Sequence, residues 1–332
     1  MPNARILPSG SYRCRATWTD KDGIRHSKSF TAKTKKEAER LAADYEVSMA
    51  SCIDSVTFHE SAEQYITSRS NTLSPTTLGE YRAMLRRGFP FSEKNIYEIT
   101  EIDIQRFINS YAGKHSPKTV RNVHGFITTV IHSVRPDMMI KTRLPQKQIY
   151  DATIPEDDDV KKILAVADPE LKKAIYMAAL GPMRRSEVCG VTYEDLKRGT
   201  LHVHQVMVKD GADWILKAVP KTTSSDRFIT FPPYVVKAFG KGEGRIIQSN
   251  PQSIYKRFKR ACKEAGTPSF RFHDLRHYGA SVLHSLGVPD AYIMERGGWK
   301  TDVTLKNVYR HALTAESKKY NDLANKHFES LA

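Results

Sequence analysis

The sequence predicts a multidomain α+β protein. A small three-stranded sheet plus one helix comes first, a helical domain follows, and a mainly helical domain with a β meander comes last. Three observations predict this order. The chain has 332 residues, which is longer than a domain that folds around a single hydrophobic core usually is. Side chains near the N-terminus alternate with the period of a strand, whereas those from about residue 56 repeat with the period of a helix. A stretch with two prolines and no periodicity then separates the helical domain from the last one.

The N-terminal pattern indicates a basic sheet. In the first strand, Arg13 and Arg15 alternate with apolar side chains, so both arginines lie on one face. A turn at Asp22-Gly23 leads into a second basic strand over residues 25–30, and a third strand comes from either flank. A capping box at Thr34 opens the helix that follows.

The helical domain is indicated by four helix starts. Each start is a side-chain cap: Thr57 with Glu60, Ser74 before Pro75, Thr100, and Ser116 before Pro117. The last of these helices carries one continuous apolar stripe up to Val134, which predicts that it lies in the centre of the domain.

After a linker, helices run to about Leu180 and a β meander follows. Its strands are expected over residues 201–208, 214–219 and 227–231, and the rest of the chain is mainly helical. These patterns divide the chain into residues 1–50, residues 55–142, a linker at 143–155, and residues 156–332.

The charge of the chain indicates its partner. Lys and Arg number 52 against 37 Asp and Glu, a formal net charge of +15 that attracts a polyanion. Nucleic acid fits this charge best, although a membrane surface or a ribosome would also fit. No apolar run approaches the ~18 residues that span a bilayer and no signal peptide opens the chain, so we expect a cytoplasmic protein with no membrane partner. The four scattered cysteines are expected to be reduced structural thiols.

Three segments concentrate side chains that suit an anion. The first surrounds Arg184, where one helix ends and another begins. The second places His273 and Arg276 three residues apart, on one face of a helix. The third runs from Gly297 to His311 and includes Tyr309. Alone, the first segment is more typical of a salt-bridged helix start. The second is more specific, although such a pair is also common on polar helix surfaces, so only the combination of the three is specific.

In this order the three segments resemble the tyrosine recombinase family, of the phage integrase type with an N-terminal arm-binding domain. The active site of that family consists of an Arg, a Lys, a His-x-x-Arg pair, a His or Trp, and a nucleophilic Tyr. Matched motif by motif, the resemblance places these groups at Arg184, Lys221, His273, Arg276, Trp299 and Tyr309. The chain departs from the pattern at Trp299, where many relatives have His, and at Pro182, where a Gly is usual. An indole donates one hydrogen bond but cannot carry a proton, so Trp299 is expected to position another group or to serve as a core aromatic.

The resemblance implies a site-specific DNA recombinase that integrates and excises a phage or other mobile element. It would work through a 3′-phosphotyrosine intermediate and a Holliday junction, with no cofactor and no metal ion. Residues 1–50 would bind arm-type DNA, residues 55–142 the core site, and residues 156–332 would carry out catalysis. The implied partners are double-stranded attachment sites, a homotetramer on DNA, a DNA-bending host factor and an excision factor, in the nucleoid of a bacterial host cell.

The side chains suit these roles. The guanidinium groups of Arg184 and Arg276 stay charged and offer forked donors to a phosphate, and His273 adds a hydrogen bond. Tyr309 has to lose its proton to attack, because its ordinary pKa is ~10. Lys221 would give a proton to the departing 5′ hydroxyl as general acid.

Basic side chains elsewhere predict further contacts with DNA. Over residues 253–265 they interleave with apolar ones, which predicts a helix with one face packed and the other toward DNA, or alternatively a solvated basic helix. The candidates for DNA contact are Lys256, Arg257, Lys259 and Arg260 on this helix, with Arg13 and Arg15 on the N-terminal sheet. An apolar stripe follows Tyr309, so this tail either folds onto its own domain or docks on a neighbouring protomer. The resemblance to the family favours docking on a neighbour.

Other functions share some of these features. A non-catalytic, architectural DNA-binding protein would have the same charge and layout, and only the complete set of six site residues separates it from an enzyme. A DNA-relaxing topoisomerase and a chromosome-dimer resolvase are disfavoured by the arm-binding domain. A metal-dependent nuclease would need clustered carboxylates, and His202 and His204 on one strand face have no third ligand close in the sequence.

Overall fold

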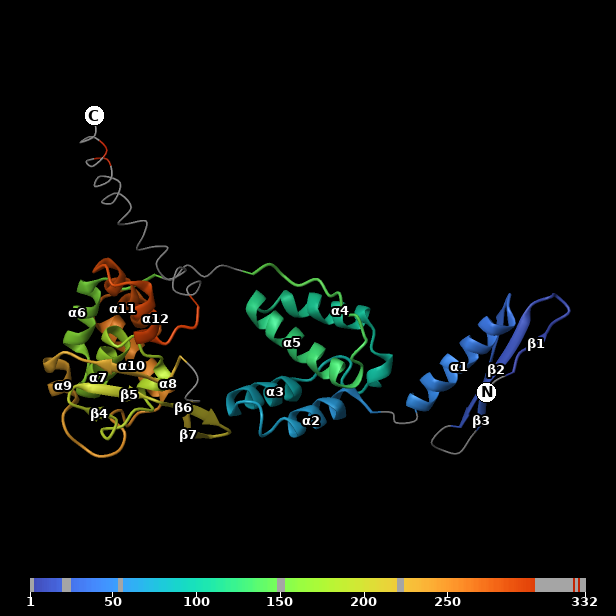
Figure 1. Cartoon of the computed structure of the whole chain (residues 1–332), viewed down its shortest axis with the longest axis horizontal. Helices are drawn as coiled ribbons and strands as arrows, with labels where there is room; N and C mark the ends of the chain where they lie inside the picture. Colours follow the sequence, from blue (N-terminus) through green and yellow to red (C-terminus); the bar gives the residue numbers. More distant parts are fainter. Residues whose placement is uncertain are drawn as a thin grey trace. The chain divides into compact units, whose positions relative to one another are not determined.

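The computed structural model describes residues 3–19, 25–52, 56–147, 153–219 and 224–301, together with residues 325 and 328 (Figure 1). The chain divides into two compact units, Met1–Ile149 and Tyr150–Ala332, and each is considered by itself. Among the described residues, no helix is both long and apolar enough to cross a membrane.

The first unit begins with an antiparallel sheet in the order β1-β2-β3, formed by Arg5–Ile6, Tyr12–Thr19 and Arg25–Ala32. The N-terminal flank therefore supplies the third strand. Helix α1, Lys35–Cys52, packs on one face of the sheet, where Cys14 and Ala16 are buried (Figure 1). Arg13 and Arg15 are exposed on the other face, opposite Thr31 and Ser29 of β3, so the basic face that the alternation predicts is present.

The helical part of the first unit has its own core. It contains α2 (Phe58–Ser68), α3 (Pro75–Arg87), a short 3-10 helix (Ile96–Glu98), α4 (Glu101–Ala112) and α5 (Pro117–Val134). All four helix starts are confirmed, because the side chains of Thr57, Ser74, Thr100 and Ser116 each accept a hydrogen bond from a backbone N–H in the first turn. The buried side chains of α5 include Phe126 and Ile127, which places this helix at the centre of the cluster.

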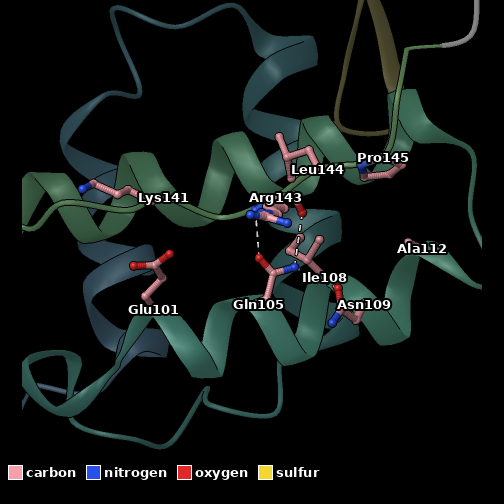
Figure 2. Close-up of a pocket in the computed structure, with 9 residues that line it drawn as sticks. All are labelled: Glu101, Gln105, Ile108, Asn109, Ala112, Lys141, Arg143, Leu144 and Pro145. Atoms are coloured by element: carbon pink, nitrogen blue, oxygen red, sulfur yellow. Dashed lines mark hydrogen bonds between the residues drawn. The ribbon is translucent and has the colours of Figure 1, made fainter.

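The segment that follows α5 is tied to the helices, as Figure 2 shows for α4. The Gln105 side chain accepts a hydrogen bond from the Arg143 backbone N–H at 2.8 Å and donates one to the Arg143 carbonyl at 3.2 Å. Arg121 of α5 donates to the Pro145 carbonyl at 2.7 Å. A groove of about 790 Å³ lies between α4 and this segment. The first residues of the expected linker are thus attached to α4 and α5.

The second unit is mainly helical. Its described helices are α6 (Asp157–Val166), α7 (Pro169–Leu180), α8 (Arg185–Val188), α9 (Pro233–Phe239), α10 (Pro251–Glu264), α11 (Asp274–Ser285) and α12 (Asp290–Gly297). Helices α7 and α11 approach closely, since a Cβ on Gly279 would lie only 2.0 Å from the Ala179 carbonyl oxygen. This contact places the middle of α11 beside the end of α7.

The strands of the second unit form two small sheets instead of the single expected meander. One has the order β4-β5-β8 (Leu196–Lys197, Thr200–Val203, Arg227–Thr230), and the other pairs β6 (Gln205–Asp210) with β7 (Asp213–Ala218). The expected strand over 201–208 is interrupted at His204, whose ring contacts Asp195 at 2.8 Å. Pairing changes there: Val203 faces Arg227, whereas Gln205 faces Ala218.

Candidate active site

Arg276 is a buried cation with an unused donor. Its side chain is 1% exposed, and its Nη1 donates to the carbonyls of Pro182 and, at 2.5 Å, Gly297. Its Nη2 has no hydrogen-bond partner among the residues that the structure describes. Burial, and then the like charge of Arg184, lowers the pKa of Arg276 to about 9, so the group is still charged at neutral pH. A buried guanidinium with an unused donor is suited to bind an anion.

Arg184 is placed by the start of α8. Its Nη1 donates to Glu187 at 2.7 Å and its Nη2 to the Gly298 carbonyl at 2.8 Å, while about a third of the side chain, 36%, is exposed. Glu187 is buried and also accepts from Arg227 at 2.9 Å. Burial alone would raise the pKa of Glu187, but the charges of Arg227 and Arg184 outweigh it and lower this pKa. Glu187 is therefore a carboxylate shared by two arginines.

His273 lies at the N-terminal end of α11, on the same turn as Arg276. Part of its surface is open to solvent, but protein atoms crowd around its ring, which meets the ring of His277 edge-on with a centroid distance of 4.9 Å. Desolvation by the surrounding protein, and then the charges of His277 and Arg276, lowers the pKa of His273 to about 4. His273 is therefore neutral at pH 7 and is suited to donate one hydrogen bond without adding charge.

Trp299 combines both roles expected of it. The side chain is 7% exposed and packs with Ala280 and Ile293. Its ring also lies against the guanidinium of Arg276, with 3.9 Å between Arg276 Cζ and the ring centroid. Gly297, two residues earlier, makes room for the ring, since a Cβ there would lie 1.8 Å from it. Trp299 is at once a core side chain and the surface on which Arg276 rests.

Lys221 and Tyr309 lie outside the described residues. Among the described residues that follow Lys221, Ser224 donates its hydroxyl to the Gly298 carbonyl oxygen at 3.4 Å, and the Ser225 hydroxyl accepts from Arg184 Nη1 at 3.5 Å. The structure thus brings Arg184, Arg276 and Trp299 together around the end of α12, and His273 lies on the same helical turn as Arg276.

The four basic candidates on α10 differ in their surroundings. Lys256 and Arg260 are exposed. Lys259 donates to the Ser269 carbonyl at 3.0 Å. Arg257 is paired with both Asp168 and Glu170 of the α7 start, and these carboxylates balance its charge. Through this pairing the guanidinium of Arg257 holds α10 on α7, and contact of Arg257 with DNA stays a prediction.

The two histidines considered as metal ligands have carboxylate partners. His202 contacts Asp226 and His204 contacts Asp195, each at 2.8 Å. His202 also stacks on Phe228 with 4.3 Å between the ring centroids. In the described ranges, no three His, Cys, Asp or Glu side chains gather into a group that could hold a metal ion.

Comparison with known proteins identifies the family. The family model described as Phage integrase family matches residues 155–316, and the model described as Phage integrase, N-terminal SAM-like domain matches residues 57–112. The chain belongs to the phage integrase family. Its relatives include a tyrosine recombinase XerC-like protein of Caldanaerobacter subterraneus, 23% identical over 89% of this chain and 90% of the relative. The integrase of prophage phiRv2 of Mycobacterium tuberculosis is 25% identical over 97% of this chain and 95% of the relative.

Solved structures share the fold of this phage integrase. The Tn1549 transposon integrase in complex with circular intermediate DNA has a TM-score of 0.65 at 17% identity, over 83% of this chain and all of the other. A lambda integrase in a tetramer bound to a Holliday junction has a TM-score of 0.58 at 18% identity, over 92% and 94% of the two chains. The family match and the named relatives make the protein a tyrosine recombinase enzyme.

Sequence reasoning missed two residues of the integrase site, Glu187 and Arg227. Both stand inside motifs that the sequence singled out, but neither is assigned a role there. Glu187 could have been found from its position three residues after Arg184 at a helix start, where an acidic side chain reaches back to the cap. No local signal pairs Glu187 with Arg227, because they are 40 residues apart in the sequence.

Proposed function

We propose that this protein is a site-specific integrase that cleaves and rejoins DNA through a 3′-phosphotyrosine intermediate and a Holliday junction, and so integrates and excises a mobile element. The observation that carries the proposal is the pair of guanidinium groups held by adjacent carbonyls, Arg276 on Gly297 and Arg184 on Gly298. Two fixed cations beside a neutral His273 form a site for a phosphodiester. The family match supports this reading.

The arginines would neutralise the charge that develops on the phosphate. When the phosphorus is attacked, negative charge concentrates on its nonbridging oxygens, and donors fixed in advance stabilise it without reorganisation. Arg276 offers the buried Nη2 that has no other partner within the described residues, and Arg184 offers its exposed edge. Neutral His273 would add a hydrogen bond to the same phosphate.

Tyr309 and Lys221 would complete the reaction. The phenol oxygen of Tyr309 loses its proton and bonds to phosphorus, the bond from phosphorus to the 5′ oxygen breaks, and Lys221 protonates that oxygen. The 5′ hydroxyl of a second strand then attacks the phosphotyrosine, and the steps run in reverse. Because one ester replaces another, the exchange needs no ATP.

The domains would divide the work of binding DNA. We propose that residues 1–50 bind arm-type sites, residues 55–142 bind the core site, and residues 156–332 form the catalytic domain after a linker at 143–155. The exposed Arg13 and Arg15 and the exposed Lys256 and Arg260 are the proposed contacts. Lys259 remains a candidate for a weaker contact, since its ammonium already has a carbonyl partner.

The assembly would be a homotetramer on two DNA duplexes, by analogy with the lambda integrase tetramer bound to a Holliday junction. An apolar tail after Tyr309 would dock on a neighbouring protomer. A DNA-bending host factor and an excision factor would set the direction of the reaction. Since the substrate is DNA, the proposed location is the nucleoid in the cytoplasm of a bacterial host.

A nicked suicide substrate tests the proposal, because it traps a covalent protein–DNA adduct. The wild type should form the adduct and Tyr309→Phe should not, with DNA binding unchanged. Tyr292→Phe, at an exposed position of α12, is the matched control and should form the adduct normally. An adduct that persists in Tyr309→Phe would show that another tyrosine is the nucleophile. DNA binding with no adduct from the wild type would favour an architectural DNA-binding protein instead.

A further inference from the structure

The C-terminal end of α12 collects three arginines. The carbonyl oxygens of Arg296, Gly297 and Gly298 accept hydrogen bonds from Arg227 Nε, Arg276 Nη1 and Arg184 Nη2, at 2.8, 2.5 and 2.8 Å. The last carbonyls of a helix have no partner inside the helix, and they carry the negative end of the helix dipole. They are therefore suited to hold three neighbouring cations that would otherwise repel one another.

We propose that Arg227 and Gly298 are positioning residues of the recombination reaction. They fix the end of α12, so that its consecutive carbonyls hold the guanidinium groups of Arg276 and Arg184 at a set separation around the phosphate. This inference rests on the proposed function, because it takes both arginines to act on the scissile phosphate. Neither Arg227 nor Gly298 needs to touch the DNA.

Arg227 links the two supports of Arg184. Its Nε binds the Arg296 carbonyl, and its Nη2 binds Glu187 at 2.9 Å. Glu187 in turn binds Arg184 Nη1 at 2.7 Å. One planar guanidinium, 5% exposed, thus joins the end of α12 to the carboxylate that holds Arg184. A lysine would keep the charge but lacks the fork that reaches both partners.

Gly298 allows β8 and the end of α12 to meet. Its backbone is left-handed, with φ of +69°, and a Cβ there would lie 2.5 Å from the Ser224 carbonyl oxygen and 3.1 Å from Arg227 Nη1. Any side chain would therefore displace the backbone before β8 or move Arg227. Gly287 supplies a matched control, because it has φ of +76° but no atom within 4 Å of its added Cβ. Alanine causes backbone strain at both positions and a steric clash only at Gly298.

The experiment compares Gly298→Ala and Arg227→Lys with Gly287→Ala and Arg245→Lys. Arg245 also donates to backbone carbonyls, those of Ile247 and Gln248, but takes no part in the cluster at the end of α12. Single-turnover cleavage is measured on a nicked duplex whose scissile group is either a phosphodiester or a methylphosphonate. In the methylphosphonate a neutral methyl group replaces one charged oxygen, so cleavage depends less on how the arginines are placed. Melting temperature and DNA affinity are measured in parallel.

Gly298→Ala and Arg227→Lys should cleave the phosphodiester about ten- to a hundredfold more slowly than the wild type, with a clearly smaller loss on the methylphosphonate. Their Kd for DNA should stay within about threefold of the wild-type value, as expected for residues that act after binding. Both controls should cleave both substrates at nearly wild-type rates.

An equal loss on both substrates would overturn the proposal, because a lower fraction of folded protein gives that result. A loss on the phosphodiester no greater than that of the controls would also overturn it. If Gly298→Ala does not fold, Arg227→Lys decides alone. Arg184→Ala and Arg276→Ala are tested in the same assay. If both cleave at the wild-type rate, the proposed function itself is refuted. If both are inactive while Arg227→Lys cleaves at the wild-type rate, only this inference is refuted.

Discussion

The guanidinium of Arg276 rests on the ring of Trp299, with 3.9 Å between Arg276 Cζ and the ring centroid. A cation over an aromatic face is stabilised by the ring quadrupole, most strongly where water is excluded. Both side chains are buried, so the contact couples the hydrophobic cluster around α11 and α12 to the proposed phosphate site.

Substitution of Trp299 should separate packing from support of Arg276. Trp299→Ala should lower the free energy of unfolding by about 3–5 kcal/mol, because it leaves a cavity among Ala280 and Ile293, and it should slow cleavage as well. Trp299→Phe keeps an aromatic face and should recover most of the cleavage rate. Urea denaturation and single-turnover cleavage measure the two effects. If Trp299→Leu cleaves as well as Trp299→Phe, the ring is not needed beneath Arg276.

Glu187→Gln should destabilise the second unit. It leaves two neighbouring arginines without their shared carboxylate, and breaking a buried pair in this way costs about 3–5 kcal/mol. Because the pKa of Glu187 is lowered on folding, its contribution is present above the ordinary value of about 4.3 and is lost as the pH falls through the lower folded value. Between pH 7 and pH 3 the free energy of unfolding should therefore fall less steeply in Glu187→Gln than in the wild type, as denaturation at each pH would measure. The same pH dependence in both proteins would contradict this assignment.

His273 and His277 should titrate well below the usual range. The pKa of each is lowered to about 4, chiefly by desolvation, so the unfolded chain binds protons more readily than the folded one. The stability that they contribute is present above about pH 6.5 and is lost as the pH falls toward 4. NMR titration of the imidazole protons should give midpoints below 5. A midpoint near 6.5 for His273 would mean that it is partly cationic during cleavage.

Arg257 and its neighbours on α10 should respond differently to substitution. Arg257→Ala removes the partner of Asp168 and Glu170 and should lower the free energy of unfolding by about 1–3 kcal/mol with little change in DNA affinity. Lys256→Ala and Arg260→Ala should leave stability unchanged and weaken DNA binding, each reducing the slope of log K against log salt by about 1. Fluorescence anisotropy over a range of salt concentrations measures the slopes. The reverse pattern would make Arg257 a DNA contact.

Features encoded by neighbouring residues could be predicted from the sequence. The caps at Thr57, Ser74 and Ser116 were predicted because cap and helix lie within four residues of each other. The pairing of β8 with β5 could not be predicted, because strand pairing depends on tertiary contacts that alternation does not encode. The spacing of three residues predicted that His273 and Arg276 lie close together, but no local pattern predicts that Arg184 and Trp299 lie beside Arg276.

Composition also hides differences between similar side chains. Lys256 and Arg257 are adjacent and both basic, yet Lys256 is exposed whereas the charge of Arg257 is balanced by two carboxylates. These belong to Asp168 and Glu170, which lie 89 and 87 positions earlier in the sequence. Only the crossing of α10 over the start of α7 distinguishes them. The same holds for Glu187 of α8, whose second arginine, Arg227, comes from the edge strand β8, 40 residues later.

The attachment of the segment after α5 has a consequence for exchanging parts between relatives. Gln105 bonds the N–H and the C=O of Arg143 and no part of its side chain, and Arg121 likewise bonds a carbonyl. Any residue with an N–H would satisfy Gln105, so only proline is excluded at position 143. Chimaeric integrases should therefore tolerate substitution at position 143, provided that Met138, Ile140 and Leu144, which pack against the helical core, stay apolar. Spacers of altered length belong after Pro145, where the backbone is no longer held by these two side chains.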